Sequence, residues 1–190
     1  MKPRVFIGLV FAALSASTSA ASQGIQGQVA PPWKVSEWFN TSPEESSTVE
    51  LSDFDGKVVY LYCFQSWCPG CHSSGFPTLT AVHEAFKDDP DVAFVAVQTV
   101  FEGYHANTLE RAKEIAKKYS LTIPIGHEGS RGKRPELMAS YRTGGTPWTI
   151  IIDREGAVRF NGFHIKKNQA VRLIEHLKQK PALNNQRTSD

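Results

Sequence analysis

Residues 56–71, GKVVYLYCFQSWCPGC, contain the features that decide the fold. The run Lys57–Phe64 is apolar, rich in β-branched and aromatic residues and without polar alternation, which predicts a central strand buried on both faces. Asp55 and Gly56 form a turn signal immediately before it. Cys68 and Cys71 follow the strand with two residues between them, a spacing that is typical of a redox pair and too short for a structural staple that closes a long loop.

The CPGC motif is predicted to open a helix that continues to about Lys87. Cys68 then lies at the helix N-terminus, where unpaired N–H groups and the macrodipole stabilise a thiolate. Cys71, one turn further on, can attack a mixed disulfide and release the product. Pro77 lies within this helix and should kink it, because proline lacks an N–H and its ring crowds the preceding turn. The motif therefore meets the two requirements of disulfide exchange, an ionisable thiol and a nearby resolving thiol.

Predicted strands and helices alternate along the rest of the chain, which favours an α/β sandwich with a mixed sheet between helices. An N-terminal β-hairpin is predicted from the short runs Val35–Phe39 and Thr48–Leu51. Asn107 and Glu110 have the pattern of a helix N-cap and its capping-box partner. The other predicted elements are the strand Val92–Val100, the strand Leu121–Ile125, a loop over residues 126–134, the helix Pro135–Tyr141, the hairpin of Pro147–Ile152 with Ala157–Phe160, and a final helix capped by Asn168.

The first 22 residues have the composition of a secretory signal peptide. Lys2 and Arg4 give a positive start, Val5–Leu14 is apolar, and small residues continue to Ser22. Cleavage is predicted near Ala20 to Ser22, which makes the mature protein periplasmic or secreted. The apolar run is shorter than the roughly 20 residues that span a bilayer. An uncleaved membrane anchor is the alternative, and it is the only membrane contact that we expect.

The chain divides into four predicted segments: a signal peptide (1–22), a linker rich in Gln, Gly and Pro (23–34), one folded domain (35–180) and a polar, frayed tail (181–190). The formal net charge of +2 falls to about zero when Lys2 and Arg4 are removed, and there is no basic tract, so nucleic acid is not an expected partner. No cofactor and no metal site are predicted. Three cysteines in an exported chain leave at least one outside an internal pair.

Residues 56–71 resemble the strand and active-site turn of thioredoxin-like proteins, and within that superfamily they are most similar to exported redoxins of the TlpA/ResA and AhpC/TSA types. The second match is the segment GGTP, which ends at Thr146-Pro147 and precedes the strand WTIII. The resemblance covers residues 35–180 and implies a thioredoxin fold and thiol–disulfide oxidoreductase activity. It also implies that Cys68 is the nucleophile, that Cys71 is the resolving thiol, and that the two form the redox disulfide.

The resemblance further implies a substrate site and partners. Thr146 and a cis Pro147 would form a platform that pairs with an extended substrate. Trp67 would be an exposed aromatic beside the nucleophile, or else an ordinary half-buried aromatic. Protein dithiols or disulfides would be the substrates, and an upstream redox partner would recharge the cysteine pair. The TlpA/ResA likeness implies reduction of disulfides in exported proteins, whereas the residues alone leave the direction of electron flow open.

Two positions near the cysteines depart from these relatives. Tyr62 occupies the position of the buried acid of thioredoxins, and Ser74 occupies the place where exported relatives carry a glutamate, so no general acid/base for Cys71 is identified. His72 is either a proton carrier or an exposed helix residue. Cys63, in the predicted strand, is either a small buried side chain or a third redox thiol.

Three other functions are compatible with parts of the sequence. CPGCH, which ends at His72, is also the C-x-x-C-H string that attaches haem in exported c-type cytochromes, although here it directly follows a buried strand in an α/β chain. A peroxiredoxin-type thiol peroxidase would require Pro in place of Leu61 and Thr or Ser in place of Gln65. A binding module or chaperone on the same fold would leave Cys68 and Cys71 without a role.

Overall fold

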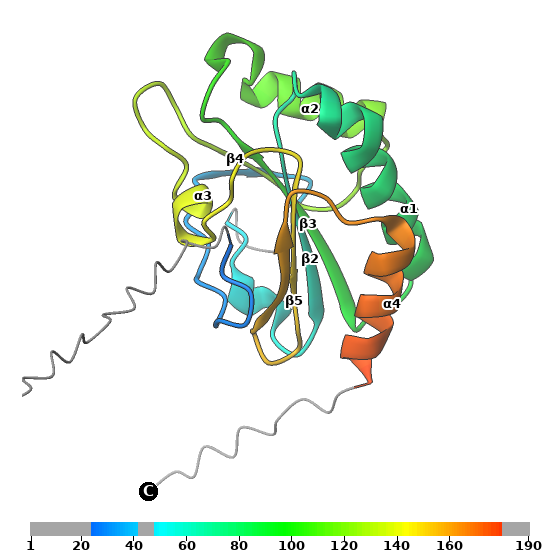
Figure 1. Cartoon of the computed structure of the whole chain (residues 1–190). Coiled ribbons are helices and arrows are strands. Elements are labelled where there is room, and N and C mark those ends of the chain that lie inside the picture. Colours follow the sequence, from blue (N-terminus) through cyan, green and yellow to red (C-terminus); the bar gives the residue numbers. More distant parts are fainter. Residues whose placement is uncertain (1–23, 42–47, 180–190) are drawn as a thin grey trace, which may run out of the picture.

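Six strands form one mixed sheet in the order β1-β4-β3-β2-β5-β6 (Figure 1). The computed structural model of the chain describes residues 24–41 and 48–179, so the predicted signal peptide (1–22) and polar tail (181–190) lie outside the described residues. β2, β3 and β4 run parallel, and β1, β5 and β6 are antiparallel to their neighbours. The strands are β1 (Glu37–Phe39), β2 (Val58–Phe64), β3 (Val92–Thr99), β4 (Ile125–Glu128), β5 (Trp148–Ile152) and β6 (Val158–Gly162).

The strand β2 lies inside the sheet, and all of its side chains are buried. It pairs in parallel with β3 and antiparallel with β5. Because successive side chains point to opposite faces, Tyr60, Tyr62 and Phe64 belong to one core cluster, and Leu61 and Cys63 belong to the other. The predicted doubly buried strand is confirmed, and the cysteine motif follows at its carboxyl end.

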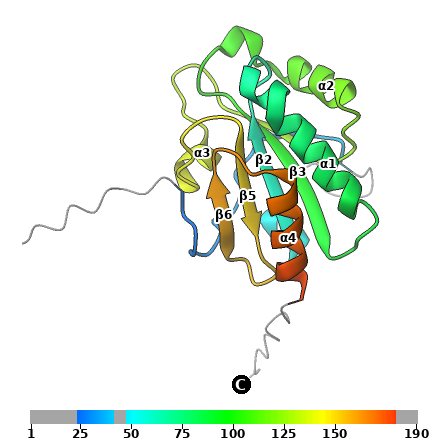
Figure 2. The same ribbon diagram turned by 45° about the vertical axis from the view of Figure 1, so that its right-hand side comes forward.

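Helices cover both faces of the sheet. The face that carries Tyr62 packs against α1 (Phe76–Phe86), α2 (Leu109–Lys118) and α4 (Lys167–Lys178), which lie on one side of the sheet in Figure 2. The opposite face packs against α3 (Glu136–Ser140) and the N-terminal segment. Within the part of the chain that the structure describes, no helix is both long and apolar enough to cross a bilayer. A mixed sheet between helices is the predicted α/β fold class, which is thereby confirmed.

Three short helical turns complete the fold: η1 (Leu51–Phe54), η2 (Cys71–Gly75) and η3 (Tyr104–Ala106). The π-helical turn η2 leads directly into α1, and Pro77 lies in the first turn of α1. Because η2 and α1 are continuous, Pro77 lies inside one helical segment and has no N–H to donate to the preceding turn. The irregularity predicted at Pro77 therefore takes the form of a π-helical turn that carries Cys71, followed by a regular helix.

The predicted N-terminal β-hairpin is wrong. β1 pairs with β4, with Phe39 opposite Ile125, whereas residues 48–50 form no strand and Leu51 begins the 3₁₀ turn η1. The physical reason is the free edge of β4, whose unpaired N–H and C=O groups accept β1 as a partner. Glu50 N–H donates to the Asp53 carboxylate at 2.8 Å and caps η1 locally.

The prediction that residues 23–34 form a linker is also corrected, because the segment packs on the domain from residue 24 onward. Ile25 and Trp33 are buried in the second core cluster. Gly27 N–H donates to the Val158 carbonyl at 2.8 Å, which attaches the segment to β6. The Gln-, Gly- and Pro-rich composition conceals these apolar anchors, since they follow neither a helical nor a strand period.

The strand predicted over Leu121–Ile125 forms later, as β4, so the first part of the predicted loop 126–134 is strand. The predicted strand ends too early because His127 and Glu128 are polar, but both side chains have hydrogen-bond partners in the structure. His127 Nδ1 lies 2.6 Å from Gln98 Oε1. The carboxylate of Glu128 accepts two backbone N–H groups at the start of α3, at 2.5 and 3.2 Å.

Two predicted helix caps are corrected as well. Thr108, and not Asn107, caps α2, because its side chain accepts the N–H of Arg111 at 3.2 Å. The N-cap of α4 is Lys166, so Asn168 lies inside the helix. The strand β3, the helix α3 and the β5–β6 hairpin occur where they were predicted, within one or two residues.

Candidate functional site

The cysteine motif occupies the turn between β2 and η2. Cys68 N–H donates to the Gln65 carbonyl at 3.2 Å, and His72 N–H donates to the Cys68 carbonyl at 3.3 Å. Both cysteines are buried, Cys68 with 6 % of its surface exposed and Cys71 with none. Their sulfurs are free thiols, so the structure describes the reduced protein.

Two backbone groups meet the sulfur of Cys68. The N–H of Cys71 donates to Sγ at 3.2 Å, and the carbonyl oxygen of Thr146 lies 3.5 Å from Sγ. The N–H belongs to the first turn of the helical segment, where donors without an intrahelical partner stabilise a thiolate. The protonated thiol can donate to the carbonyl, and the ionised sulfur can accept the N–H, so both states of Cys68 have a partner.

Cys71 is held as a neutral thiol. Burial raises its pKa well above the usual value, and the hydrogen bond with Cys68 acts in the same direction, whereas the backbone of Gln65 and the Tyr62 hydroxyl oppose the shift. The Tyr62 hydroxyl is buried and forms no hydrogen bond of good geometry within the described residues, although it lies close enough to the Cys71 thiol to affect its pKa. Burial, and after it the neighbouring Cys71, raise the pKa of Tyr62 well above its usual value. The phenol therefore keeps its proton and remains able to donate a hydrogen bond.

Gly75 makes room for the Tyr62 hydroxyl. A Cβ at position 75 would overlap Tyr62 Oη and would lie 3.0 Å from Cβ of Pro147. The Tyr62 ring packs against Phe64 and Phe76, with centroids 6.1 and 5.4 Å apart. These aromatic contacts fix the phenol between β2 and α1, with its hydroxyl at the π-helical turn.

The predicted substrate platform lies against the cysteine turn. The Thr146–Pro147 peptide bond is cis, as the resemblance implies. A Cβ at Gly70 would lie 3.2 Å from Cδ of Pro147, so the absence of a side chain allows this close approach. Trp67 is 45 % exposed, which favours the exposed alternative, and a Cβ at Gly103 would lie 2.9 Å from its Nε1. The structure thus brings together all of the predicted site residues, which are Trp67, Cys68, Cys71, Thr146 and Pro147.

His72 is partly buried, and both of its ring nitrogens have protein partners, so the prediction of an exposed residue is wrong. Nε2 lies 2.7 Å from the Ser66 carbonyl, and Nδ1 lies 2.8 Å from the Tyr119 hydroxyl. A carbonyl can only accept, so the network assigns the proton to Nε2 and makes Nδ1 the acceptor of the Tyr119 hydroxyl. These bonds attach the active-site turn to the end of α2, which gives His72 a positioning role.

Asn107 supports the same turn, a role that the sequence analysis missed. Its buried Oδ1 accepts the N–H of Ser66 at 2.7 Å, and its Nδ2 donates to the carbonyls of Glu102 and Gly103 at 3.1 and 3.0 Å. Ser66 Oγ in addition accepts a hydrogen bond from Gln98 Nε2 at 2.5 Å. The sequence offered only an Asn ahead of a helix, and its partner Ser66 lies 41 positions away.

Within the described residues, neither Cys63 nor Ser74 forms a hydrogen bond with the sulfur of Cys68 or Cys71. Cys63 is fully buried on the face of β2 opposite Tyr62, and burial raises its pKa, which favours the small buried side chain over a third redox thiol. The Ser74 hydroxyl donates to the Gly70 carbonyl at 2.9 Å. Among the residues that the structure describes, no three His, Cys, Asp or Glu side chains are grouped so that they could hold a metal ion.

The model of the AhpC/TSA family matches residues 26–161. The chain belongs to the AhpC/TSA family. The thiol-disulfide oxidoreductase ResA of Oceanobacillus iheyensis is 28 % identical over 132 residues, which cover 70 % of this chain and 62 % of that protein. ResA of Bacillus cereus is 26 % identical over 121 residues, which cover 63 % of this chain and 62 % of that protein. The match thus spans less than two thirds of the length of these ResA relatives.

Solved structures place this AhpC/TSA family member in the thioredoxin superfamily. A thioredoxin-like superfamily protein superposes with a TM-score of 0.73 at 32 % identity, covering 81 % of this chain and 98 % of its own. A thiol-disulfide isomerase from Corynebacterium glutamicum superposes with a TM-score of 0.72 at 27 % identity, covering 82 % and 98 %. The predicted identification as a thioredoxin-superfamily redoxin is confirmed.

Proposed function

We propose that this protein is an exported thiol–disulfide oxidoreductase that reduces disulfide bonds in other exported proteins. One observation carries the proposal: the Cys68 sulfur accepts the N–H of Cys71 at 3.2 Å, while the Cys71 thiol itself is fully buried. This asymmetry suits an attacking thiol and a protected second thiol. The ResA relatives, which are named thiol-disulfide oxidoreductases, support the same activity.

In the first step, the Cys68 thiolate attacks one sulfur of the substrate disulfide. A bond forms between Cys68 and that sulfur, the substrate S–S bond breaks, and the second substrate sulfur leaves as a thiolate with the electron pair. Before the attack the N–H of Cys71 stabilises the thiolate. The backbone before Pro147 offers the substrate an extended partner.

In the second step, Cys71 passes its proton to the substrate thiolate released in the first step, directly or through water, and its sulfur attacks the sulfur of Cys68. The Cys68–Cys71 disulfide forms, the mixed disulfide breaks, and the remaining substrate sulfur leaves as a thiolate. The Tyr62 hydroxyl, which counteracts the rise in the pKa of Cys71, would donate to the Cys71 thiolate as it forms. Two electrons have then passed to the substrate, and an upstream redox partner must return them to the cysteine pair.

The roles of the two cysteines are tested by trapping. Cys71→Ser should accumulate a mixed disulfide with an oxidised protein substrate, because the attack still occurs and the resolution does not. Cys68→Ser should accumulate none, and Cys63→Ser serves as the control in which both reacting thiols remain. Mixed disulfides in Cys68→Ser alone would reverse the assignment of nucleophile and resolving thiol.

The direction of electron flow is tested by the reduction potential of the Cys68–Cys71 pair, titrated against glutathione or dithiothreitol. A potential near that of thioredoxin, about −270 mV, would support the reductase. A potential near −120 mV, roughly that of the strongest oxidants of this fold, would make the protein a disulfide donor instead. Consumption of hydrogen peroxide in preference to disulfides would favour the peroxidase alternative.

Export rests on the sequence of residues 1–22. Expression of the full chain, followed by cell fractionation and determination of the mature N-terminus, tests it. A new N-terminus near Ala20 to Ser22 in the periplasm or medium would support the proposal. A full-length protein in the cytosolic fraction would contradict it.

A further inference from the structure

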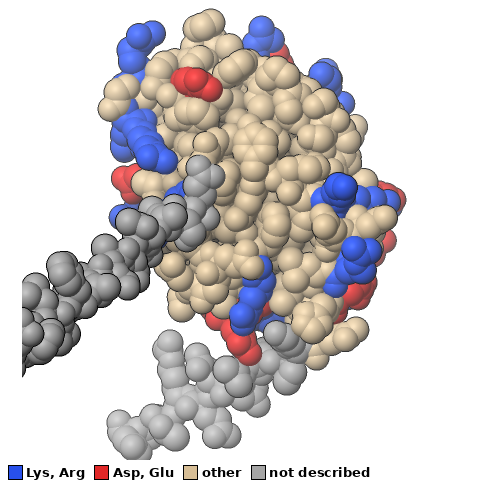
Figure 3. All heavy atoms as spheres, in the orientation of Figure 1, with Lys and Arg blue, Asp and Glu red and all other residues tan. Residues whose placement is uncertain are grey.

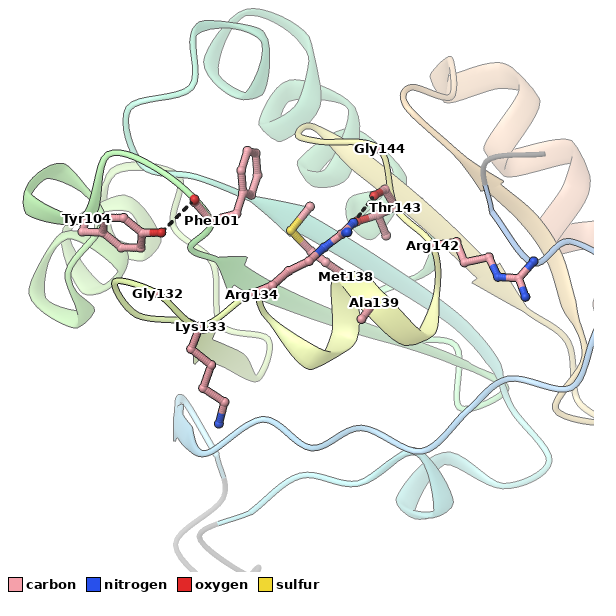
Figure 4. A pocket seen from close by; sticks show the side chains of 10 residues that line it. All are labelled: Phe101, Tyr104, Gly132, Lys133, Arg134, Met138, Ala139, Arg142, Thr143 and Gly144. Atoms are coloured by element: carbon pink, nitrogen blue, oxygen red, sulfur yellow. Dashed lines mark hydrogen bonds between the residues drawn. The ribbon is translucent and has the colours of Figure 1, made fainter. Parts of the chain in front are cut away.

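A hollow of about 650 Å³ opens beside the active-site turn. Its walls come from the segment after β3, from the loop before α3, and from α3 with the residues that follow it. The side chains that matter are those of Phe101, Tyr104, Arg134, Met138 and Thr143 (Figure 4). Apolar and aromatic side chains together with a few polar groups are the usual lining of a ligand site.

The hollow adjoins the proposed substrate platform. Gly144, which lines it, is two residues before Thr146, whose carbonyl lies 3.5 Å from the Cys68 sulfur. Two residues of extended chain span at most about 7 Å. On the opposite side, Gly103 lies in the segment that lines the hollow and is in close contact with Trp67. A peptide whose cysteine reacts at Cys68 can therefore reach the hollow with a side chain two or three residues away.

The lining of the hollow is positively charged. It includes Lys133, Arg134 and Arg142, and no Asp or Glu is among the described residues that line it. In Figure 4 the Arg134 side chain extends across the hollow towards Thr143, whereas Lys133 and Arg142 point away from it. Arg134 Nη2 donates to the Thr143 carbonyl at 3.4 Å. Figure 3 shows Lys and Arg side chains at several places around the edge of one face of the molecule and an uncharged centre of the same face.

Thr143 adds a buried hydroxyl that has no partner. Its residue is 2 % exposed, and its Oγ1 forms no hydrogen bond within the described residues. Buried hydroxyls in folded proteins are almost always satisfied, so an unsatisfied one indicates a partner that is supplied from elsewhere. The backbone carbonyl of the same residue accepts a hydrogen bond from Arg134, and both residues line the hollow.

We infer that the hollow binds an Asp or Glu side chain of the protein whose disulfide reacts at Cys68. This inference rests on the proposed function and specifies its substrate class. A carboxylate matches the hollow because the Arg134 guanidinium and the Thr143 hydroxyl can both donate to it. Phe101 and Met138 provide apolar contact for the methylene groups of the same side chain. Substrates with a basic residue at that position would be repelled.

The experiment uses the reduced full chain and a series of disulfide-containing peptides. Each peptide carries one Glu, or one Gln as its neutral match, at one of the three positions on either side of the reacting cysteine. We expect Glu at the matching position to raise the second-order rate constant of reduction about two- to fivefold over Gln. Because Arg134 is exposed, high salt should reduce this preference.

Two variants test which groups produce the preference. Arg134→Gln and, separately, Thr143→Val should each bring the ratio of the Glu and Gln rate constants towards one. Arg172→Gln, at an exposed arginine on α4, is the matched control and should keep the ratio. If Arg134→Gln and Arg172→Gln lowered the ratio of the Glu and Gln rate constants equally, the preference would reflect general charge attraction, and the proposed site would be refuted.

The possible failures are distinguishable. Reduction of all peptides at equal rates would refute the acidic-residue site and leave the oxidoreductase proposal intact. No reduction of any peptide would refute the proposed function itself. If Arg134→Gln slowed the reduction of glutathione disulfide but not of the Glu peptides, the hollow would bind a small anionic disulfide, and the inference of a protein partner would be wrong.

Discussion

Replacing Tyr62 by Phe should stabilise the reduced protein and slow its second chemical step. The substitution removes one hydroxyl that is buried and has no partner within the described residues. Leaving such a group unsatisfied costs about 1–3 kcal/mol. The ring contacts with Phe64 and Phe76 remain. We therefore expect the free energy of unfolding of reduced Tyr62→Phe to rise by about 1–2 kcal/mol.

The expected kinetic effect has the opposite sign. The Tyr62 hydroxyl is one of the groups that counteract the rise in the pKa of Cys71. Without it, the Cys71 thiolate loses a donor in a buried site, where a hydrogen bond to a charged group contributes about 1.5–3 kcal/mol. Since about 1.4 kcal/mol corresponds to a factor of ten, resolution of the mixed disulfide should slow roughly tenfold or more. The pKa of Cys71 should rise further.

Urea unfolding under reducing conditions measures the stability, and stopped-flow release of the second substrate thiol measures the resolution step. Tyr60→Phe is the matched control, because Tyr60 lies on the same face of β2 and its hydroxyl interacts with the Thr149 side chain. That variant should lose stability and keep the resolution rate. If Tyr62→Phe instead lost 1 kcal/mol or more, at roughly the cost of a broken hydrogen bond, and resolved at the normal rate, the reasoning would be refuted.

Three further substitutions test the supporting structure. Asn107→Ala removes three hydrogen bonds of a buried amide and should lower the free energy of unfolding by about 2–4 kcal/mol. As the control, Thr108→Ala removes the α2 cap and should lower it by only about 1 kcal/mol. If urea unfolding gave equal decreases in the free energy of unfolding for the two variants, the role of the amide would be contradicted. Gly75→Ala puts a methyl group onto the Tyr62 hydroxyl and should destabilise by about 1–3 kcal/mol, and the double variant with Tyr62→Phe should recover part of that loss rather than add to it. Burial raises the pKa of Cys63, so the unfolded chain releases the thiol proton at a lower pH than the folded protein does. The free energy of unfolding of the reduced protein should therefore fall as the pH rises above about 9. Each such thiol contributes a decrease of up to about 1.4 kcal/mol per pH unit. Cys63→Ala should make this dependence shallower, and an unchanged slope would exclude the thiol as its source.

The sequence was most informative where local chemistry and burial agree. The run Lys57–Phe64 is apolar and rich in β-branched and aromatic residues, which indicates a buried strand, and β2 lies in that run. The sequence predicted the position of Cys68 and Cys71 for the same reason, because a strand end followed by a helix start fixes the turn between them. The β5–β6 hairpin was also predictable, since its turn residues lie between two apolar runs.

The features that could not be predicted depend on hydrogen-bond partners that are distant in the sequence. His127 and Glu128 are polar residues in a strand, and their partners come from β3 and α3. Asn107 has the residue type of a helix cap, but Ser66 offers its side chain a backbone N–H across the active site. β1 could not be assigned to β4 from its own residues, because the pairing depends on an edge that exists only in the folded sheet.

The position of β2 determines how the protein would bear mechanical load. In the proposed mixed disulfide, a substrate joined to Cys68 would pull on the chain just beyond the end of β2. That strand is held on both sides, by β3 and by β5, along nearly its whole length. A pull along the strand must therefore shear two rows of hydrogen bonds together, whereas an edge strand could be peeled away one bond at a time. The pairing of β2 on both sides would therefore keep the strand in the sheet while a substrate is bound to Cys68.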